Sequence, residues 1–208
     1  MTQPFGFAAM PSDARPERPR EPRQVLLFSG HMVDAPDRAE PRFPPQKVVA
    51  AARRIAEVLD GLQAGPQDLA LCQAAAGGDL LFLEACEQRG VRCEVLLPFE
   101  EPEFIRRSIE PVAGGRQWLA RYRGLRAGLP QPPRPMPREL GPLAEGADPF
   151  ERCNQWLLDT ALAHGPDKVR FVCLWNGGGG DGPGGTAHMV EQVRARGGQV
   201  HWIDTRTL

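Results

Sequence analysis

One stretch near the carboxyl end constrains the fold of this 208-residue chain most strongly. Residues 169–175 form a short apolar, β-branched and aromatic run, which predicts a strand covered on both faces. Seven glycines follow within the ten residues 176–185, and such a run lets a ligand approach the bare backbone. From Thr186 a polar and apolar pattern predicts a helix, whose first-turn N–H groups attract anions, phosphate above all. This stretch therefore predicts a strand, a glycine loop and a helix start that binds phosphate.

The rest of the chain alternates strands and helices in the same way. Four more strand-like runs, each with several apolar residues, lie at 25–29, 69–73, 92–97 and 199–204. Amphipathic helical patterns lie between successive runs. The alternation predicts an α/β fold of the Rossmann-like, three-layer α/β/α type with a mainly parallel five-stranded sheet. Counted along the chain, the expected strand order is 3-2-1-4-5.

The domain organisation follows from the distribution of proline and charge. Residues 1–23 combine prolines with Arg and Glu, which predicts a disordered leader. Residues 24–208 should form a single domain, with a partly irregular insertion at about 111–147 that is rich in arginine and then in proline. The long segment 32–45 could form a lid, because loops of such length in compact domains are often functional.

Composition excludes several classes of partner. The net charge of −1 and the pI of about 6.4 give no overall field toward nucleic acid or an anionic membrane. Five scattered cysteines without a C-x-x-C pair fit neither a disulfide framework nor a zinc site, which predicts a reducing cytoplasm. No signal peptide or membrane span is recognisable. We expect no metal and no cofactor, and whether the chain forms a homo-oligomer is left open.

The ligand crevice of an open parallel sheet lies at the carboxyl ends of its strands, where the winding direction reverses. With strand 25–29 at the centre, that point lies between it and strand 169–175. The residues that follow strands at this edge are the candidate ligand-binding residues: Ser29, Gly30, His31, Gly77, Gly78, Asp79, Asn176, Gly177, Gly182, Gly184, Gly185 and Thr186.

Each of these candidates has a plainer interpretation. Both glycine-rich turns could merely cap helices, Ser29 could cap a turn, and Asp79 could cap the helix that it begins. Standard motifs are missing, since there is no G-x-G-x-x-G after the first strand, no G-x-x-x-x-G-K-[ST] and no G-x-S-x-G. Glu191 is a candidate ribose ligand or acid–base residue, although a surface glutamate is the commoner identity.

Four short motifs together resemble the SLOG superfamily of Rossmann-like nucleotide-binding domains, which includes DprA-like, LOG-like and TRPM-associated domains. They are Phe28-Ser29-Gly30-His31, Ala76-Gly77-Gly78-Asp79 with Glu84, Leu96-Leu97-Pro98-Phe99, and Gly182-Pro183-Gly184-Gly185-Thr186. The resemblance covers about residues 24–205. It implies binding of a nucleotide or nucleotide-derived ligand, and the LOG branch implies a phosphoribohydrolase that releases base from nucleoside monophosphates.

The hydrolase branch of that superfamily carries P-G-G-x-G-T-x-x-E. In this chain Gly185 directly precedes Thr186, Met189 stands three residues later, and Glu191 falls on a different helix face. The resemblance to the superfamily therefore supports ligand binding by this chain more strongly than catalysis. We predict a ligand sensor, for which signalling and defence are the candidate roles. An N-glycosidic hydrolase of nucleoside monophosphates, with Glu191 as its catalytic residue, is the alternative, and a scaffold without ligand is the third.

Overall fold

The computed structural model describes residues 21–178 and 185–208. Its strands are β1 Val25–Gly30, β2 Leu69–Cys72, β3 Arg92–Leu97, β4 Arg134–Pro135, β5 Val169–Trp175 and β6 Gln199–Asp204. Its α-helices are α1 Val48–Gly61, α2 Gly78–Glu87, α3 Glu101–Ser108, α4 Gly115–Gly128, α5 Pro149–Leu162 and α6 Thr186–Ala195. Short 3₁₀ turns lie at Pro45–Lys47, Arg138–Leu140, Pro166–Lys168 and Thr205–Thr207.

The strands of the described residues form one parallel sheet in the order β4-β3-β2-β1-β5-β6. The predicted α/β class, the parallel pairing and the order of the five expected strands are confirmed. The predicted number of strands was wrong, because the two-residue β4 pairs with the end of β3 and adds a sixth strand at the edge. The winding direction reverses between β1 and β5, where the ligand crevice was expected.

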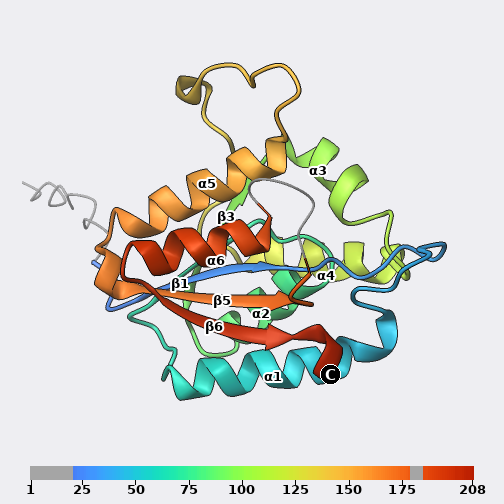
Figure 1. Cartoon of the computed structure of the whole chain (residues 1–208), viewed down its shortest axis with the longest axis horizontal. Coiled ribbons are helices and arrows are strands. Elements are labelled where there is room, and N and C mark those ends of the chain that lie inside the picture. Colours follow the sequence, from blue (N-terminus) through green and yellow to red (C-terminus); the bar gives the residue numbers. More distant parts are fainter. Residues whose placement is uncertain (1–20, 179–184) are drawn as a thin grey trace, which may run out of the picture.

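Two hydrophobic clusters define three layers. Because alternate side chains of a strand point to opposite faces, Leu26 and Phe28 of β1 pack in one cluster, and Val25 and Leu27 pack in the other. The first cluster joins the sheet to α1, α2, α3 and α4, and the second joins it to α5 and α6. Figure 1 shows α5 and α6 on one face of the sheet and α1 on the other.

The segment 111–147 is more regular than its sequence suggested. Helix α4 occupies 115–128 and buries Trp118, Tyr122 and Leu125 in the first cluster. Its arginines pair with distant glutamates, Arg121 with Glu84 of α2 and Arg126 with Glu101 of α3. The irregular part is thus confined to the residues that follow α4, which Figure 1 shows projecting beyond α5.

The predicted disordered leader, residues 1–23, falls mostly outside the described residues. Within the described part, Arg23 donates from Nε and Nη2 to the buried Asp68 carboxylate at 2.9 and 2.8 Å. Burial alone would raise the pKa of Asp68, but hydrogen bonds from Arg23, Gln24 and the Gly65 N–H lower it below its usual value. Arg23, at the end of the predicted leader, is therefore held against the folded domain.

Candidate functional site

A cavity of about 310 Å³ opens at the carboxyl ends of β1 and β5, at the reversal of the winding direction. Ser29, Gly30 and His31 line it from the end of β1, and Trp175 lines it from the end of β5. Helix α6 contributes Gly185 and Thr186 at its start, while Asp79 lies on the wall formed by α2. Six of the predicted ligand-binding residues are thus brought together: Ser29, Gly30, His31, Asp79, Gly185 and Thr186.

Two contacts join the β1 end to the β5–α6 connection across the cavity. The Ser29 and Thr186 hydroxyl oxygens lie 3.2 Å apart, although the residues are separated by most of the chain. His31 accepts a hydrogen bond at Nε2 from the Asn176 backbone N–H at 3.2 Å. Thr186 is the first residue of α6, and among the described residues no side chain caps that helix start. The first-turn N–H groups of α6 therefore lie in the same helix turn as the Thr186 hydroxyl and have no partner within the helix.

The glycines after β1 and β2 serve close packing of the chain. Gly77 has φ +127°, and a Cβ atom there would lie 2.7 Å from the Val33 nitrogen and 2.9 Å from the His31 carbonyl oxygen. At Gly78 a Cβ would meet the Phe28 ring at 3.1 Å, and at Gly30 the same ring at 2.9 Å. Neither Gly77 nor Gly78 is among the residues that line the cavity. Close packing of the chain alone therefore explains why these positions require glycine, and no bound ligand is needed to explain it.

Asp79 is a buried carboxyl group on the wall of the cavity. Its Oδ2 accepts a hydrogen bond from the Ala75 N–H at 3.2 Å, so it fastens the preceding turn, in which Ala74 adopts a left-handed φ of 69°. Burial raises the pKa of Asp79 to about 7, and backbone N–H groups of residues 73–75 only partly oppose this. The cavity thus contains a carboxyl group that changes charge near neutral pH.

A change of Asp79 to Asn is expected to stabilise the protein at alkaline pH. The pKa of Asp79 in the folded state, about 7, lies above the ordinary value near 3.8, so the folded chain holds this proton longer than the unfolded chain. Its contribution to the free energy of unfolding therefore falls as the pH rises from about 4 to 7. We expect the free energy of unfolding of the Asp79→Asn protein to exceed that of the wild type by about 1–3 kcal/mol at pH 8 and by less at pH 4.

Urea denaturation of both proteins at pH 4 and pH 8 measures this difference. Asp159→Asn on α5 is the control, because Asp159 is exposed and does not line the cavity. An equal Asp79→Asn effect at both pH values would contradict the raised pKa.

The remaining predicted residues lie elsewhere. Asn176 accepts the Gly178 N–H at Oδ1 at 3.1 Å and does not line the cavity. Gly177 has φ +74° and abuts the side chains of Trp202 and Arg206. Glu191 is exposed on α6 and lines no part of the cavity. Gly182 and Gly184 lie outside the described residues.

Several lining residues were missed by sequence reasoning. Arg42 and Met32 come from the segment 32–45, which is fastened because Asp34 accepts the backbone N–H groups of Arg42 and Phe43. Arg107 of α3 reaches the cavity while its guanidinium lies 4.4 Å from the Phe99 ring centroid. The length of the segment 32–45 signalled the first pair, whereas Arg107 belongs to a run of arginines from Arg106 to Arg126 whose charge could position phosphate but is more typical of an exposed face.

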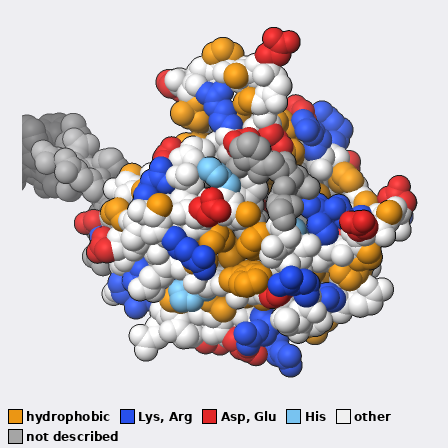
Figure 2. Space-filling model, viewed as in Figure 1, with side chains coloured by type: hydrophobic (Ala, Val, Ile, Leu, Met, Phe, Trp, Pro, Cys, Tyr) orange, Lys and Arg blue, Asp and Glu red, His pale blue; other side chains and the backbone are white. Residues whose placement is uncertain are grey.

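Trp175 was expected to be a core residue, but it lines the cavity. It tilts against Trp202 of β6 with ring centroids 5.7 Å apart, and Trp202 is 46% exposed. Figure 2 shows apolar side chains gathered over the ends of β5 and β6 on this face. Among the described residues the buried Trp175 Nε1 has no hydrogen-bond partner, which leaves an N–H donor next to the cavity.

Other kinds of site find little support in the described residues. Across 21–178 and 185–208, no group of three or more His, Cys, Asp or Glu side chains is placed to hold a metal ion. None of the helices in these ranges has the length and apolar character needed to cross a bilayer. All five cysteines are buried and unpaired.

Comparison with known proteins gives a distant structural likeness. No protein-family model matches the sequence, and no curated protein matches it. Among solved structures, the chain is similar to the structure of the Moco carrier protein from Chlamydomonas reinhardtii, with a TM-score of 0.34 and 14% sequence identity. The alignment covers 90% of this chain and 92% of that chain. A likeness of this size assigns neither ligand nor activity to this chain.

Proposed function

We propose that the cavity at the ends of β1 and β5 binds a phosphate-bearing small molecule of the nucleotide class, and that the chain is a SLOG-type ligand-binding domain. The proposal rests on one observation. Ser29 and Thr186, whose hydroxyl oxygens lie 3.2 Å apart, line the same cavity at the start of α6, which no side chain of the described residues caps. A phosphate at this point receives hydrogen bonds from both hydroxyls and from first-turn N–H groups of the helix.

The charges around the cavity favour one end of it for phosphate. Arg42 and Arg107 line this cavity, and both add positive potential to it. Asp148 and Glu151 lie on the side formed by the start of α5. An anionic group is therefore best placed beside Ser29 and Thr186, with the rest of the ligand toward α5.

An N-glycosidic hydrolase acting on nucleoside monophosphates is the second candidate, and Asp79 is the observation in its favour. A carboxyl group with a pKa of about 7 can exchange a proton at neutral pH, as a general acid or base must. Glu191, which the sequence suggested for this role, is exposed away from the cavity. We favour binding without turnover, because phosphate recognition needs only groups already gathered around the helix start.

Protein purified without added ligand, then extracted and examined by mass spectrometry, tests the binding proposal. We expect a phosphate-bearing, nucleotide-derived compound in the extract of the wild type and less of it from Thr186→Glu protein. Incubation with AMP, GMP, CMP and UMP separates the two candidates, and we expect no free base. Base release that Asp79→Asn abolishes and Glu191→Gln leaves unchanged would establish the hydrolase instead.

A further inference from the structure

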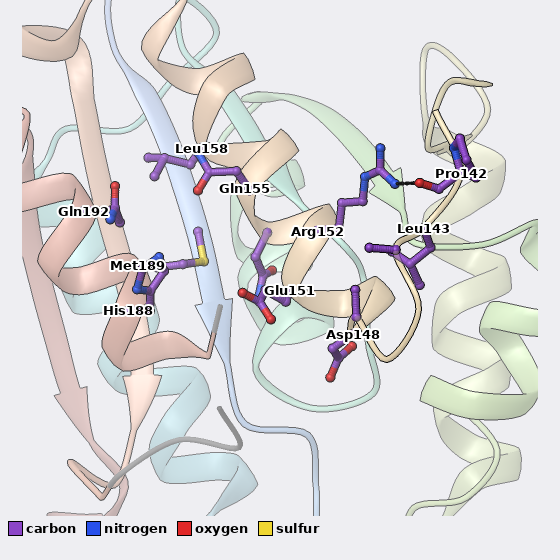
Figure 3. A pocket seen from close by; sticks show the side chains of 13 residues that line it. Pro142, Leu143, Asp148, Glu151, Arg152, Gln155, Leu158, His188, Met189 and Gln192 are labelled. Carbon is purple, nitrogen blue, oxygen red and sulfur yellow. Dashed lines mark hydrogen bonds between the residues drawn. The ribbon is translucent and has the colours of Figure 1, made fainter. Parts of the chain in front are cut away.

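A second cavity of about 450 Å³ lies beside the first, over the start of α5. In Figure 3, α5 runs between side chains of α6 on one side and the segment that carries Pro142 and Leu143 on the other. Asp148, Glu151 and Asn154 line both cavities. The two spaces are therefore neighbours along the first turns of α5, and these three residues belong to both linings.

The second cavity has a different chemistry from the first. Its apolar lining comes from Leu143, Leu158 and Met189, a leucine and methionine surface suited to the face of a heteroaromatic ring. Its arginine, Arg152, donates to the carbonyl oxygens of Pro142, at 2.8 Å, and Leu140. Arg152 thus holds the segment 140–142 against α5, whereas Arg42 and Arg107 line the first cavity and not the second.

Glu151 supplies the hydrogen-bonding group that distinguishes possible ring ligands. Its half-buried side chain lines the cavity and points toward His188 and Met189 in Figure 3. Among the described residues, no side chain or backbone group pairs with its carboxylate. Of the two lining glutamines, Gln155 donates its amide N–H to Asp159, and Gln192 accepts a hydrogen bond from Arg196 at its amide oxygen. An ionised carboxylate accepts hydrogen bonds and donates none, so it selects N–H groups over carbonyl oxygens.

We propose that this second cavity receives the base of the nucleotide, and that Glu151 selects bases bearing an exocyclic amino group. The inference rests on the proposed function, since it requires the phosphate to lie beside Ser29 and Thr186. A base with a carbonyl oxygen in place of the amino group would set two acceptors against each other, and the loss on such a mismatch is large in a partly dehydrated site.

Calorimetric titration of the full chain with five compounds tests the inference. AMP and IMP differ by an amino group against an oxo group, CMP and UMP differ in the same way, and ribose 5-phosphate lacks a base. We expect the amino member of at least one pair to bind about tenfold or more tightly than its oxo partner. Glu151→Gln should reduce that preference to less than about threefold while changing ribose 5-phosphate affinity by less than about twofold. Glu191→Gln, a carboxylate change on exposed α6, should alter none of these values.

The titrations distinguish failure of the base cavity from failure of the proposed phosphate site. If ribose 5-phosphate binds and all four nucleotides bind no more tightly, the base cavity is wrong and the phosphate site stands. The role of Glu151 is also wrong if the wild type prefers the amino member of neither pair. It is wrong as well if the Glu151→Gln protein keeps the preference of the wild type. If none of the five compounds binds, the proposed function is wrong and the inference falls with it.

Discussion

Replacing Gly77 by alanine is expected to lower the free energy of unfolding by about 3 kcal/mol or more. Gly77 has φ +127° and ψ −126°, a combination that L side chains rarely adopt. An added Cβ would also lie 2.7 Å from the Val33 nitrogen and 3.0 Å from the Met32 carbonyl carbon. These are backbone atoms, held by the Met32–Gly77 bridge and by the hydrogen bond from the Gly78 N–H to the His31 carbonyl at 3.1 Å. Neither Gly77 nor the backbone of residues 31–33 can move without disturbing the turn after β1.

Urea denaturation at neutral pH measures this effect, with Gly197→Ala as the matched control. Gly197 follows α6 with φ +82°, and a Cβ there would meet nothing within 4 Å. The control measures the loss of unfolding free energy when alanine is placed at a positive φ without a steric clash, about 1 kcal/mol. Similar losses in the two variants would show that the chain around Gly77 adapts readily, and the steric explanation would be wrong.

Changing Thr186 to glutamate is expected to weaken ribose 5-phosphate binding at least about 100-fold, which corresponds to about 2.8 kcal/mol. The new carboxylate would lie at the first position of α6, opposite Ser29, where we place the phosphate. It would repel the phosphate and compete for the same N–H groups. The same charge is favourable at a helix start, by about 0.3–1 kcal/mol, so the fold should be kept.

The control for this variant is Thr186→Ser, which retains the hydroxyl and should keep affinity within about threefold. Calorimetric titration gives the affinities, and thermal unfolding without ligand checks the fold. A folded Thr186→Glu protein with wild-type affinity would place the phosphate elsewhere.

The sheet was predictable because its information is local. Runs such as 25–29 and 169–175 are apolar at nearly every position, as expected of strands buried on both faces, and alternation with helices favours parallel pairing. Helix α4 was missed for the opposite reason. Trp118, Tyr122 and Leu125 have helical spacing, but arginines surround them, and the glutamates that pair with Arg121 and Arg126 are distant in sequence.

The edge of the sheet that carries the candidate site was predictable, but the role of each residue there was not. Ser29 and Thr186 follow from their positions after β1 and before α6. Gly77 and Gly78 were expected to admit a ligand, yet the chain segment after β1 occupies the space beside Gly77. Burial of Asp79 and the approach of Arg107 depend on tertiary packing, which no local pattern encodes.

Titration of the wild-type protein with ribose 5-phosphate and with ribose tests the phosphate site most directly. The two compounds share the sugar and differ in the phosphate, so the difference in affinity isolates the group that we place beside Ser29 and Thr186. We expect saturable binding of ribose 5-phosphate that weakens as salt is added, and affinity for ribose lower by at least about tenfold. Equal affinity for the two compounds, or no binding of either, would contradict a phosphate site at the start of α6.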